Sequence, residues 1–207
     1  MKKIILIGNG GHGKVIQAII HRTEGYELVG ILDEAIEGYY EKDTIFYDSL
    51  DNLSNYTNDY LFVIAIGDNS VRNAIIKSNN LTDDNFTSII DANTIIPPDV
   101  SIGTGTVVMP GVVINPGSTI GKHSIVNTRA VVEHDNTLGN FVHISPNATL
   151  AGTVTVKDFV HVGSGATVIP NTTIYQHSVI AAGAVVTEDI EENSLAVGVP
   201  AKIIKRS

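Results

Sequence analysis

A histidine between two carboxylates, Glu133-His134-Asp135, is the clearest candidate for acid–base chemistry in this sequence. A carboxylate beside an imidazole orients the ring and favours its protonated form, so the ring takes up a proton more readily. A general base of this kind suits an amine or a hydroxyl group that attacks a thioester. The sequence contains no cysteine, which excludes a thiolate nucleophile and a disulfide framework. We therefore predict that His134 is a catalytic base with Asp135 as its partner, and we leave the role of Glu133 open.

A glycine-rich loop near the N-terminus, GNGGHG at residues 8–13, points to phosphate binding. Its spacing fits the pattern G-x-G-x-x-G that joins a strand to a helix, and Asp33 follows at the distance expected for a ribose contact. Glycines are needed there because side chains would keep phosphates away from the backbone amides. A second loop, AIGDN at residues 65–69, ends another strand pattern on what we expect to be the same edge of the sheet. The alternative is a tight strand-to-helix turn without a ligand.

Two segments of different periodicity must position these residues. Up to about residue 86, strand patterns alternate with helical patterns, which predicts a small parallel sheet with crossover helices. The strand patterns lie at 2–8, 26–34 and 60–69, and the helical patterns lie at 13–22 and 71–78. Because a complete dinucleotide fold has about six strands, these few strands indicate a Rossmann-like domain that holds a single nucleotide diphosphate, such as that of a UDP-sugar, rather than NAD.

The second segment has a period of six. From Ile90 to Val186 every sixth residue is isoleucine, leucine or valine, without a gap. Four residues after each of them stands a small or β-branched residue in nearly every repeat, and Asn136 departs from this rule. This period is typical of a parallel β-helix, in which the aliphatic side chains fill the core and the small residues let the chain turn. We therefore predict two domains, residues 1–86 and residues 87–207.

In a hexapeptide β-helix, each residue stacks on the residue three repeats further along. His134 then lies below Gly152, where a backbone N–H could polarise the carbonyl of a bound acetyl group. His143 and His161 form a second column that could face a cleft between subunits. A third column, expected to be exposed and structural, contains His123, Phe141, Phe159 and His177. No close spacing of histidines and acidic residues demands a metal, so we expect none.

The charge balance argues against two classes of partner. The formal net charge is −9, from 22 acidic and 13 basic side chains, whereas nucleic acids and anionic membranes are bound by clustered lysine and arginine. The apolar run in MKKIILIGNGG is shorter than the ~7–15 residues of a secretory signal and the ~20 residues of a membrane span. We expect a soluble, cytoplasmic protein that binds neither nucleic acid nor membrane.

Five motifs together resemble those of a known family. GNGGHG, AIGDN, NTRAVVEHDN, FVHIS and GVPAK are similar to motifs of the sugar O-acyltransferases of sialic-acid and bacillosamine pathways, which are hexapeptide-repeat acyltransferases. Within that family the chain looks most like the UDP-N-acetylbacillosamine N-acetyltransferases and their exopolysaccharide-cluster relatives. The resemblance covers essentially the whole chain. It implies a left-handed β-helix, a homotrimer with active sites between neighbouring prisms, and transfer of acetyl from acetyl-CoA to the 4-amino group of a UDP-sugar for glycan or polysaccharide biosynthesis.

The resemblance also implies roles for individual residues. His134 would take the proton from the attacking amine, and Asp135 would tune that histidine. Contacts with acetyl-CoA, in addition to Gly152, would come from His143, Ser164, Ala182 and Lys202, the last within the segment VGVPAK at 197–202. Contacts with the UDP-sugar would come from Gly10, Gly11, His12, Asp33, Glu34 and Gly67.

Three other functions remain open at this point. The same base could act on a hydroxyl group, in an O-acetyltransferase of sialic acid or another sugar. The glycine loop could instead belong to an NAD-dependent or nucleotide-sensing protein whose β-helix serves only for trimerisation. A non-catalytic β-helix scaffold is the third. Release of thiol from acetyl-CoA that depends on an added amino sugar separates the predicted N-acetyltransferase from all three.

Overall fold

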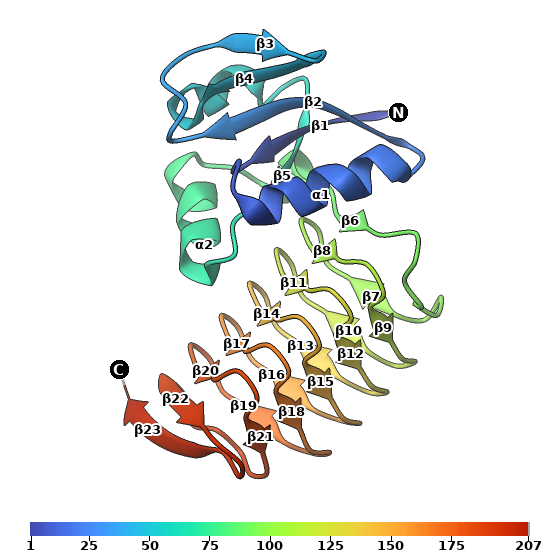
Figure 1. The fold of residues 1–207 in the computed structure, drawn as a ribbon, viewed down its shortest axis with the longest axis vertical. Helices are drawn as coiled ribbons and strands as arrows, with labels where there is room; N and C mark the ends of the chain where they lie inside the picture. Colours follow the sequence, from blue (N-terminus) through green and yellow to red (C-terminus); the bar gives the residue numbers. More distant parts are fainter. Residues whose placement is uncertain (207) are drawn as a thin grey trace.

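The computed structural model describes residues 1–206 and consists of an α/β domain seated on one end of a long β-helix (Figure 1). The N-terminal sheet has the strand order β3-β4-β2-β1-β5, and all of its pairings are parallel except that of β3 with β4. Its elements are β1 (Lys2–Ile7), α1 (Gly11–Arg22), β2 (Tyr26–Asp33), β3 (Tyr40–Lys42), β4 (Ile45–Ser49), η1 (Leu50–Tyr56), β5 (Leu61–Ile64), α2 (Asn69–Ser78) and η2 (Asp83–Asn85).

The three predicted strands and two predicted helices of this domain are present, with two corrections. The third strand is shorter than expected because α2 begins at Asn69, where the side chain of Asp68 accepts a hydrogen bond from Val71 N at 2.9 Å and caps the helix. The prediction also missed β3 and β4, so the sheet has five strands rather than three. Every residue of β3 is exposed, and such a strand has no alternating apolar pattern by which it could be recognised.

The β-helix is built from three sheets whose strands stack at intervals of 18 residues, as Ile125 pairs with His143 (Figure 1). One five-stranded sheet contains β7 (Ser101–Ile102), β10 (Thr119–Ile120), β13 (Thr137–Leu138), β16 (Thr155–Val156) and β19 (Thr173–Ile174). The other contains β9 (Val113–Ile114), β12 (Val131–Val132), β15 (Thr149–Leu150), β18 (Thr167–Val168) and β21 (Val185–Val186). The eight-stranded sheet contains β6 (Ile89–Ile90), β8 (Val107–Val108), β11 (Ile125–Val126), β14 (His143–Ile144), β17 (His161–Val162), β20 (Val179–Ile180), β22 (Ser194–Val197) and β23 (Lys202–Arg206).

The period of six predicted the interior of this prism correctly. The second residue of each two-residue strand belongs to the aliphatic series of period six, and those from Val108 to Val186 are all buried. We expected the small residues four positions later to form the outer corners. They do not, because from Val112 onward they are buried in the interior as well. The chain turns one residue earlier, in a left-handed backbone conformation, as at Asp135 (φ 59°) and Asn147 (φ 57°). Ser207, the last residue of the predicted second domain, lies outside the described residues.

A column of stacked rings follows one corner of the prism, as predicted. Neighbouring rings lie 5.2, 5.0 and 4.8 Å apart and are nearly parallel. The column contains His123, Phe141, Phe159 and His177, and Phe86 closes its first end edge-on. His123 is therefore only 5% exposed, whereas the prediction placed the whole column at the surface. The reason is that the N-terminal domain covers this end of the corner.

Candidate active site

His134 and Asp135 lie together at the corner between β12 and β13. Nδ1 of His134 is 2.8 Å from Asp135 Oδ2, and the two side chains are 59% and 64% exposed. Because an ionised carboxylate can only accept, Nδ1 carries the proton and Nε2 is left with the lone pair that a base needs. Gly117 makes room for this arrangement, since a Cβ atom there would lie 2.4 Å from Asp135 Oδ1. Glu133 is occupied elsewhere, as it accepts a hydrogen bond from Asn115 Nδ2 at 2.8 Å.

Gly152 lies directly over the ring of His134. A Cβ atom at Gly152 would come within 2.6 Å of both Cε1 and Nε2 of the imidazole, so any other residue here would displace the ring. Its N–H donates no hydrogen bond to any other residue in the described part of the chain. In the same column, the positions one coil before His134 and one coil after Gly152 are Pro116 and Pro170, which have no N–H at all. An open N–H donor thus occurs in this column beside the free nitrogen of His134.

His143 lies on a different face and contacts the N-terminal domain. It is 9% exposed, its Nδ1 lies 3.2 Å from Gly67 O, and its Nε2 lies 3.1 Å from Asn127 Nδ2. A carbonyl only accepts and the amide N–H donates, so both ring nitrogens are engaged and the ring is neutral. Burial, with the nearby His161 and Arg72, lowers the pKa of His143 to about 3. Its ring also stacks on that of His161, with centroids 4.7 Å apart.

The sheet assignments show that these two histidines lie on opposite sides of the prism. His134 occupies the corner where the sheet of β12 meets the sheet of β13, while His143 belongs to the third, eight-stranded sheet. In a three-sided prism a corner between two faces is opposite the remaining face. Ser164 and Ala182 are exposed at an edge of the eight-stranded sheet, one coil apart. One chain therefore does not bring the predicted base together with the predicted acetyl-CoA contacts His143, Ser164 and Ala182.

The glycine loop opens α1 as predicted. A Cβ atom at Gly10 or Gly11 would meet nothing within 4 Å, whereas one at Gly13 would lie 2.6 Å from Gly8 O. Gly10 and Gly11 thus face open space at a helix N-terminus, where free amides attract anions. Asp33 holds the loop, because its carboxylate oxygens accept from Asn9 N at 2.7 Å and from Ala35 N at 2.9 Å.

Two other predicted nucleotide contacts lie close to this loop. Glu34 is exposed and, with Gly8 and Asp33, lines a cavity of about 120 Å³ at the carboxyl edge of the sheet. The Nε2 atom of His12 is buried and has no hydrogen-bond partner within residues 1–206. Burial, reinforced by the charge of Arg72, lowers the pKa of His12 to about 4.

Strand β23, which begins at Lys202, lies at the far end of the prism from α1 and the glycine loop (Figure 1). The Nζ atom of Lys202 is 2.8 Å from Glu188 Oε1, and both side chains are exposed. The segment that contains it turns between β22 and β23, and Ala201 N donates to Val185 O at 2.7 Å. The structure thus shows VGVPAK closing the last coil.

Arg72 is a residue that the sequence analysis missed. It is 1% exposed, and it donates to His123 O at 2.9 Å, to Gly67 O at 2.9 Å and to Asn69 Oδ1 at 2.8 Å. Asn69 in turn donates to Phe159 O at 3.0 Å. Burial lowers the pKa of Arg72 to about 10, so the guanidinium remains charged at neutral pH. Its position three residues before Ile75, on the apolar face of the predicted helix, was the signal that could have revealed it.

We expect Arg72→Met to destabilise the protein by about 2–4 kcal/mol, because several buried carbonyl groups lose their donor. The measurement is the free energy of unfolding in urea, followed by circular dichroism. Lys77→Met is the matched control, since it removes a cation from the exposed side of the same helix. Equal stability of the two variants would contradict the role of Arg72 as a link between the domains.

Three histidines that are at least partly buried, His12, His123 and His143, predict that the stability of the protein falls in mild acid. Burial is the first cause that lowers the pKa of His12 to about 4, of His123 to about 4 and of His143 to about 3, from 6.5. Between the lowered native pKa of each histidine and its unfolded pKa of 6.5, the unfolded chain binds a proton that the native chain does not. The stabilisation is therefore complete above pH 6.5 and is lost as the pH falls towards the native pKa values.

Each of these histidines contributes a slope of up to about 1.4 kcal/mol per pH unit to the free energy of unfolding. We expect urea unfolding between about pH 5 and about pH 7.5 to show a steep rise of stability with pH. His123→Phe should reduce that slope, because phenylalanine already occupies the same column at Phe141 and Phe159. An unchanged slope in this variant would contradict the assignment.

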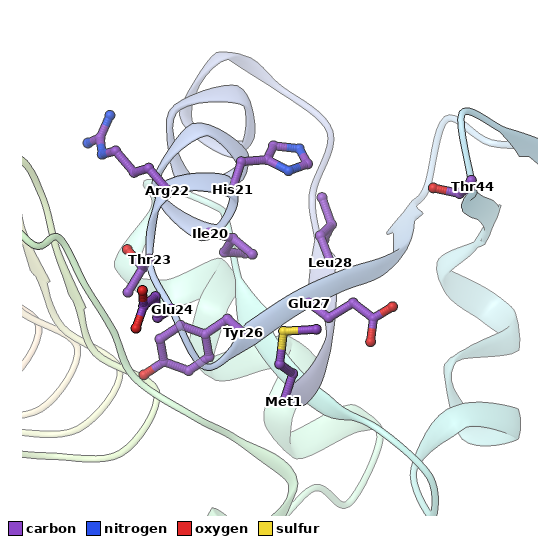
Figure 2. Close-up of a pocket in the computed structure, with 10 residues that line it drawn as sticks. All are labelled: Met1, Ile20, His21, Arg22, Thr23, Glu24, Tyr26, Glu27, Leu28 and Thr44. Carbon is purple, nitrogen blue, oxygen red and sulfur yellow. The ribbon is translucent and has the colours of Figure 1, made fainter.

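A cavity of about 480 Å³ lies away from these residues, at the opposite edge of the N-terminal sheet. Figure 2 shows that His21 and Arg22 project from the end of α1 in different directions, with Glu24 and Glu27 also apart from each other. Arg22 is engaged, because its Nε donates to the buried Asp91 Oδ2 at 2.7 Å. This hollow therefore lies beside the contact between the end of α1 and the first coil of the β-helix.

Residues 1–206 contain neither a cluster of metal ligands nor a helix that could span a membrane. No group of three or more histidine, cysteine, aspartate or glutamate side chains is arranged as metal ligands. Within the same residues, no helix combines the length and the apolar character that crossing a membrane requires.

The fold and this corner define a class of protein. A parallel β-helix of hexapeptides that presents a His–Asp pair below a glycine with an open N–H is the architecture of a hexapeptide-repeat acyltransferase. Two family models match the chain: the PglD N-terminal domain over residues 3–78 and the GMPPB C-terminal domain over residues 70–186.

Solved structures and a curated relative identify the family. The chain is 34% identical to perosamine N-acetyltransferase from Caulobacter crescentus, with a TM-score of 0.88 over 99% of this chain and 98% of that one. It is 31% identical to the acetyltransferase domain of PglB from Neisseria gonorrhoeae, with a TM-score of 0.89 over 99% and 100% of the two chains. It is also 41% identical to UDP-N-acetylbacillosamine N-acetyltransferase from Bacillus subtilis, over 53% of this chain and 52% of that protein, about half of its length. The chain belongs to the PglD-type sugar N-acetyltransferases with a hexapeptide-repeat domain.

Proposed function

We propose that this protein transfers the acetyl group of acetyl-CoA to the 4-amino group of a nucleotide-linked amino sugar, for glycan or polysaccharide biosynthesis. The observation that carries the proposal is the pairing of His134 Nε2, free to accept a proton, with the open N–H of Gly152 above it. Relatives of the chain support the substrates. The Caulobacter enzyme has been solved with CoA and GDP-perosamine, and the Neisseria domain with acetyl coenzyme A.

The geometry gives each group a step in the reaction. The amine attacks the thioester carbonyl carbon, and its proton passes to His134 Nε2, while Nδ1–H continues to donate a hydrogen bond to Asp135 Oδ2. The negative charge that develops on the carbonyl oxygen is met by the N–H of Gly152. The tetrahedral intermediate then expels the CoA thiolate, which takes the proton from the imidazolium and leaves as CoA thiol. No acyl-enzyme is needed, in agreement with a sequence that contains no cysteine.

We infer that the nucleotide binds at the start of α1. The amides of Gly10 and Gly11 would hold the diphosphate, because these glycines face open space at a helix N-terminus. His12, Glu34 and Gly67 border the same edge of the sheet, while Asp33 shapes the loop through its backbone contacts. The nucleotide is proposed to be UDP, as in the relative from Bacillus subtilis. Because acetyl-CoA and nucleotide sugars are both present in the cytoplasm, we propose that the enzyme acts in that compartment.

We further infer a homotrimer whose active sites lie between neighbouring chains. His134 is on the corner opposite the eight-stranded sheet, whereas His143, Ser164 and Ala182 lie on that sheet or its edge. A complete site therefore needs the His134 corner of one chain beside this edge of another, and a ring of identical chains repeats that contact in a closed form. Acetyl-CoA would lie in the groove between them.

The test is an acceptor screen that follows thiol release from acetyl-CoA. UDP-, GDP- and dTDP-linked 4-amino sugars are compared with their 4-hydroxy counterparts and with sialic acid. We expect turnover with the UDP-linked amine, none with the hydroxy sugars, and an amide in the product by mass spectrometry. Turnover with sialic acid alone, or with no acceptor of the panel, would overturn the proposal. Turnover with the GDP-linked amine alone would overturn the choice of nucleotide.

A further inference from the structure

Asn136 is the one amide side chain in its interior column, whose other members are Val100, Ser118, Val154, Thr172 and Ile190. It is 0% exposed, two residues after His134. The equivalent interior positions in the adjacent repeats are Ala130 and Val142, and one coil further along in its own column stands Val154. Burying an amide costs free energy unless its donors and acceptor are all satisfied. A residue of this size and polarity therefore has a specific set of partners, or it destabilises the coil.

The partners of Asn136 come from both sides of the imidazole. Nδ2 donates to Glu133 O, the carbonyl that precedes His134, and to Ala151 O at 3.0 Å, the carbonyl that precedes Gly152. Oδ1 accepts from Val154 N at 3.0 Å, two residues after Gly152. One buried side chain thus binds the backbone that carries His134 and the backbone that lies over its ring.

These bonds also fix the direction of the Gly152 N–H. The Ala151–Gly152 peptide is planar and trans, so its C=O and its N–H point in opposite directions. Because Asn136 holds Ala151 O towards the interior, the N–H of Gly152 points outward, on the side where the ring of His134 lies. The gap between Nε2 and this N–H is therefore set from inside the prism, by a residue that touches neither substrate.

We propose that Asn136 is a positioning residue for catalysis, whose amide holds His134 and the Gly152 N–H at the separation that the reaction needs. This inference rests on the proposed function, in which His134 is the base and Gly152 the donor. Small displacements of reacting groups are costly, since about 1 Å of misplacement reduces a rate by about 100-fold. A structural role alone would affect stability and leave the chemical step intact.

The experiment compares Asn136→Val with Ser124→Val in the full-length protein. Ser124 is a matched control because it makes the same kind of bonds at another corner: Oγ donates to Gly139 O at 3.1 Å and accepts from Val142 N at 3.0 Å. Both variants should lose thermal stability to a similar extent. We expect Asn136→Val to lower kcat by about 10–100-fold with little change in KM for either substrate, and Ser124→Val to leave kcat unchanged.

Asn136→Ser provides a test by conservative rescue. Ser118, one coil back in the same column, donates to Glu133 O at 2.9 Å, so a serine in this column can hold a carbonyl of the next coil. Asn136→Ser should recover part of the kcat lost in Asn136→Val. Equal kcat in Asn136→Val and the wild type, or an equal loss in Ser124→Val, would overturn the inference. The wild type and His134→Ala are measured in parallel. Absence of turnover by the wild type with every acceptor would overturn the proposed function, whereas undiminished turnover by His134→Ala would overturn the role of His134 as the base.

Discussion

Replacing His134 by alanine should reduce kcat by about 10²–10⁴-fold, the usual contribution of a general base. The amine of the acceptor would then have to lose its proton to water during attack, while the N–H of Gly152 and the bound substrates stay in place. For this reason KM for acetyl-CoA and for the nucleotide sugar should change little. The measurement is the initial rate of thiol release at saturating acceptor, with the wild type and the variant at equal concentration.

The fold should survive this substitution, because the His134 side chain is 59% exposed and, among residues 1–206, hydrogen-bonds only to Asp135. His177→Ala is the control, since it removes an exposed histidine from the end of the ring column. Asp135→Asn should give an intermediate loss, as the ring keeps a neighbour but loses the carboxylate that stabilises the imidazolium. Wild-type turnover by His134→Ala would show that another group accepts the proton.

Mixing two inactive variants should restore activity if each active site is shared between chains. Gly11→Val blocks the proposed diphosphate site without a clash, because a Cβ atom there meets nothing within 4 Å. His134→Ala removes the base. In a trimer that contains both kinds of chain, one site combines an intact His134 corner with an intact nucleotide loop of its neighbour, so about one third of wild-type activity should return.

The experiment requires co-expression with two different affinity tags and purification through both, so that every assembly contains both variants. Each variant alone should be inactive. If one chain supplied both residues of a site, no mixed assembly would contain an intact site and activity would stay absent. That result would contradict the shared site. Sedimentation of the doubly purified sample gives the number of chains in the assembly.

The repeat could be predicted from the sequence in detail because a β-helix relates stacking to chain position by a fixed interval. The aliphatic period placed Val132 and Leu138 in the core on either side of His134, and it placed Gly152 over the ring. The same rule predicted the column of rings. Strands β1, β2 and β5 and both α-helices of the N-terminal domain were also predicted, whereas β3 and β4 were not. Strand β3 was missed because an exposed edge strand has no apolar pattern.

The sequence by itself therefore determined the prism, its interior and the corner that carries His134 and Asp135. The tertiary structure alone decided how the N-terminal domain sits on that prism. This placement depends on Arg72 and Asn69, which bond to carbonyls of His123 and Phe159 far along the chain. Contacts of this kind do not recur at a fixed sequence interval. They depend on which polar groups become buried next to each other when the two domains pack. The tertiary structure also places His143 in contact with Gly67, on the side of the prism opposite His134. One chain therefore holds only part of the proposed site.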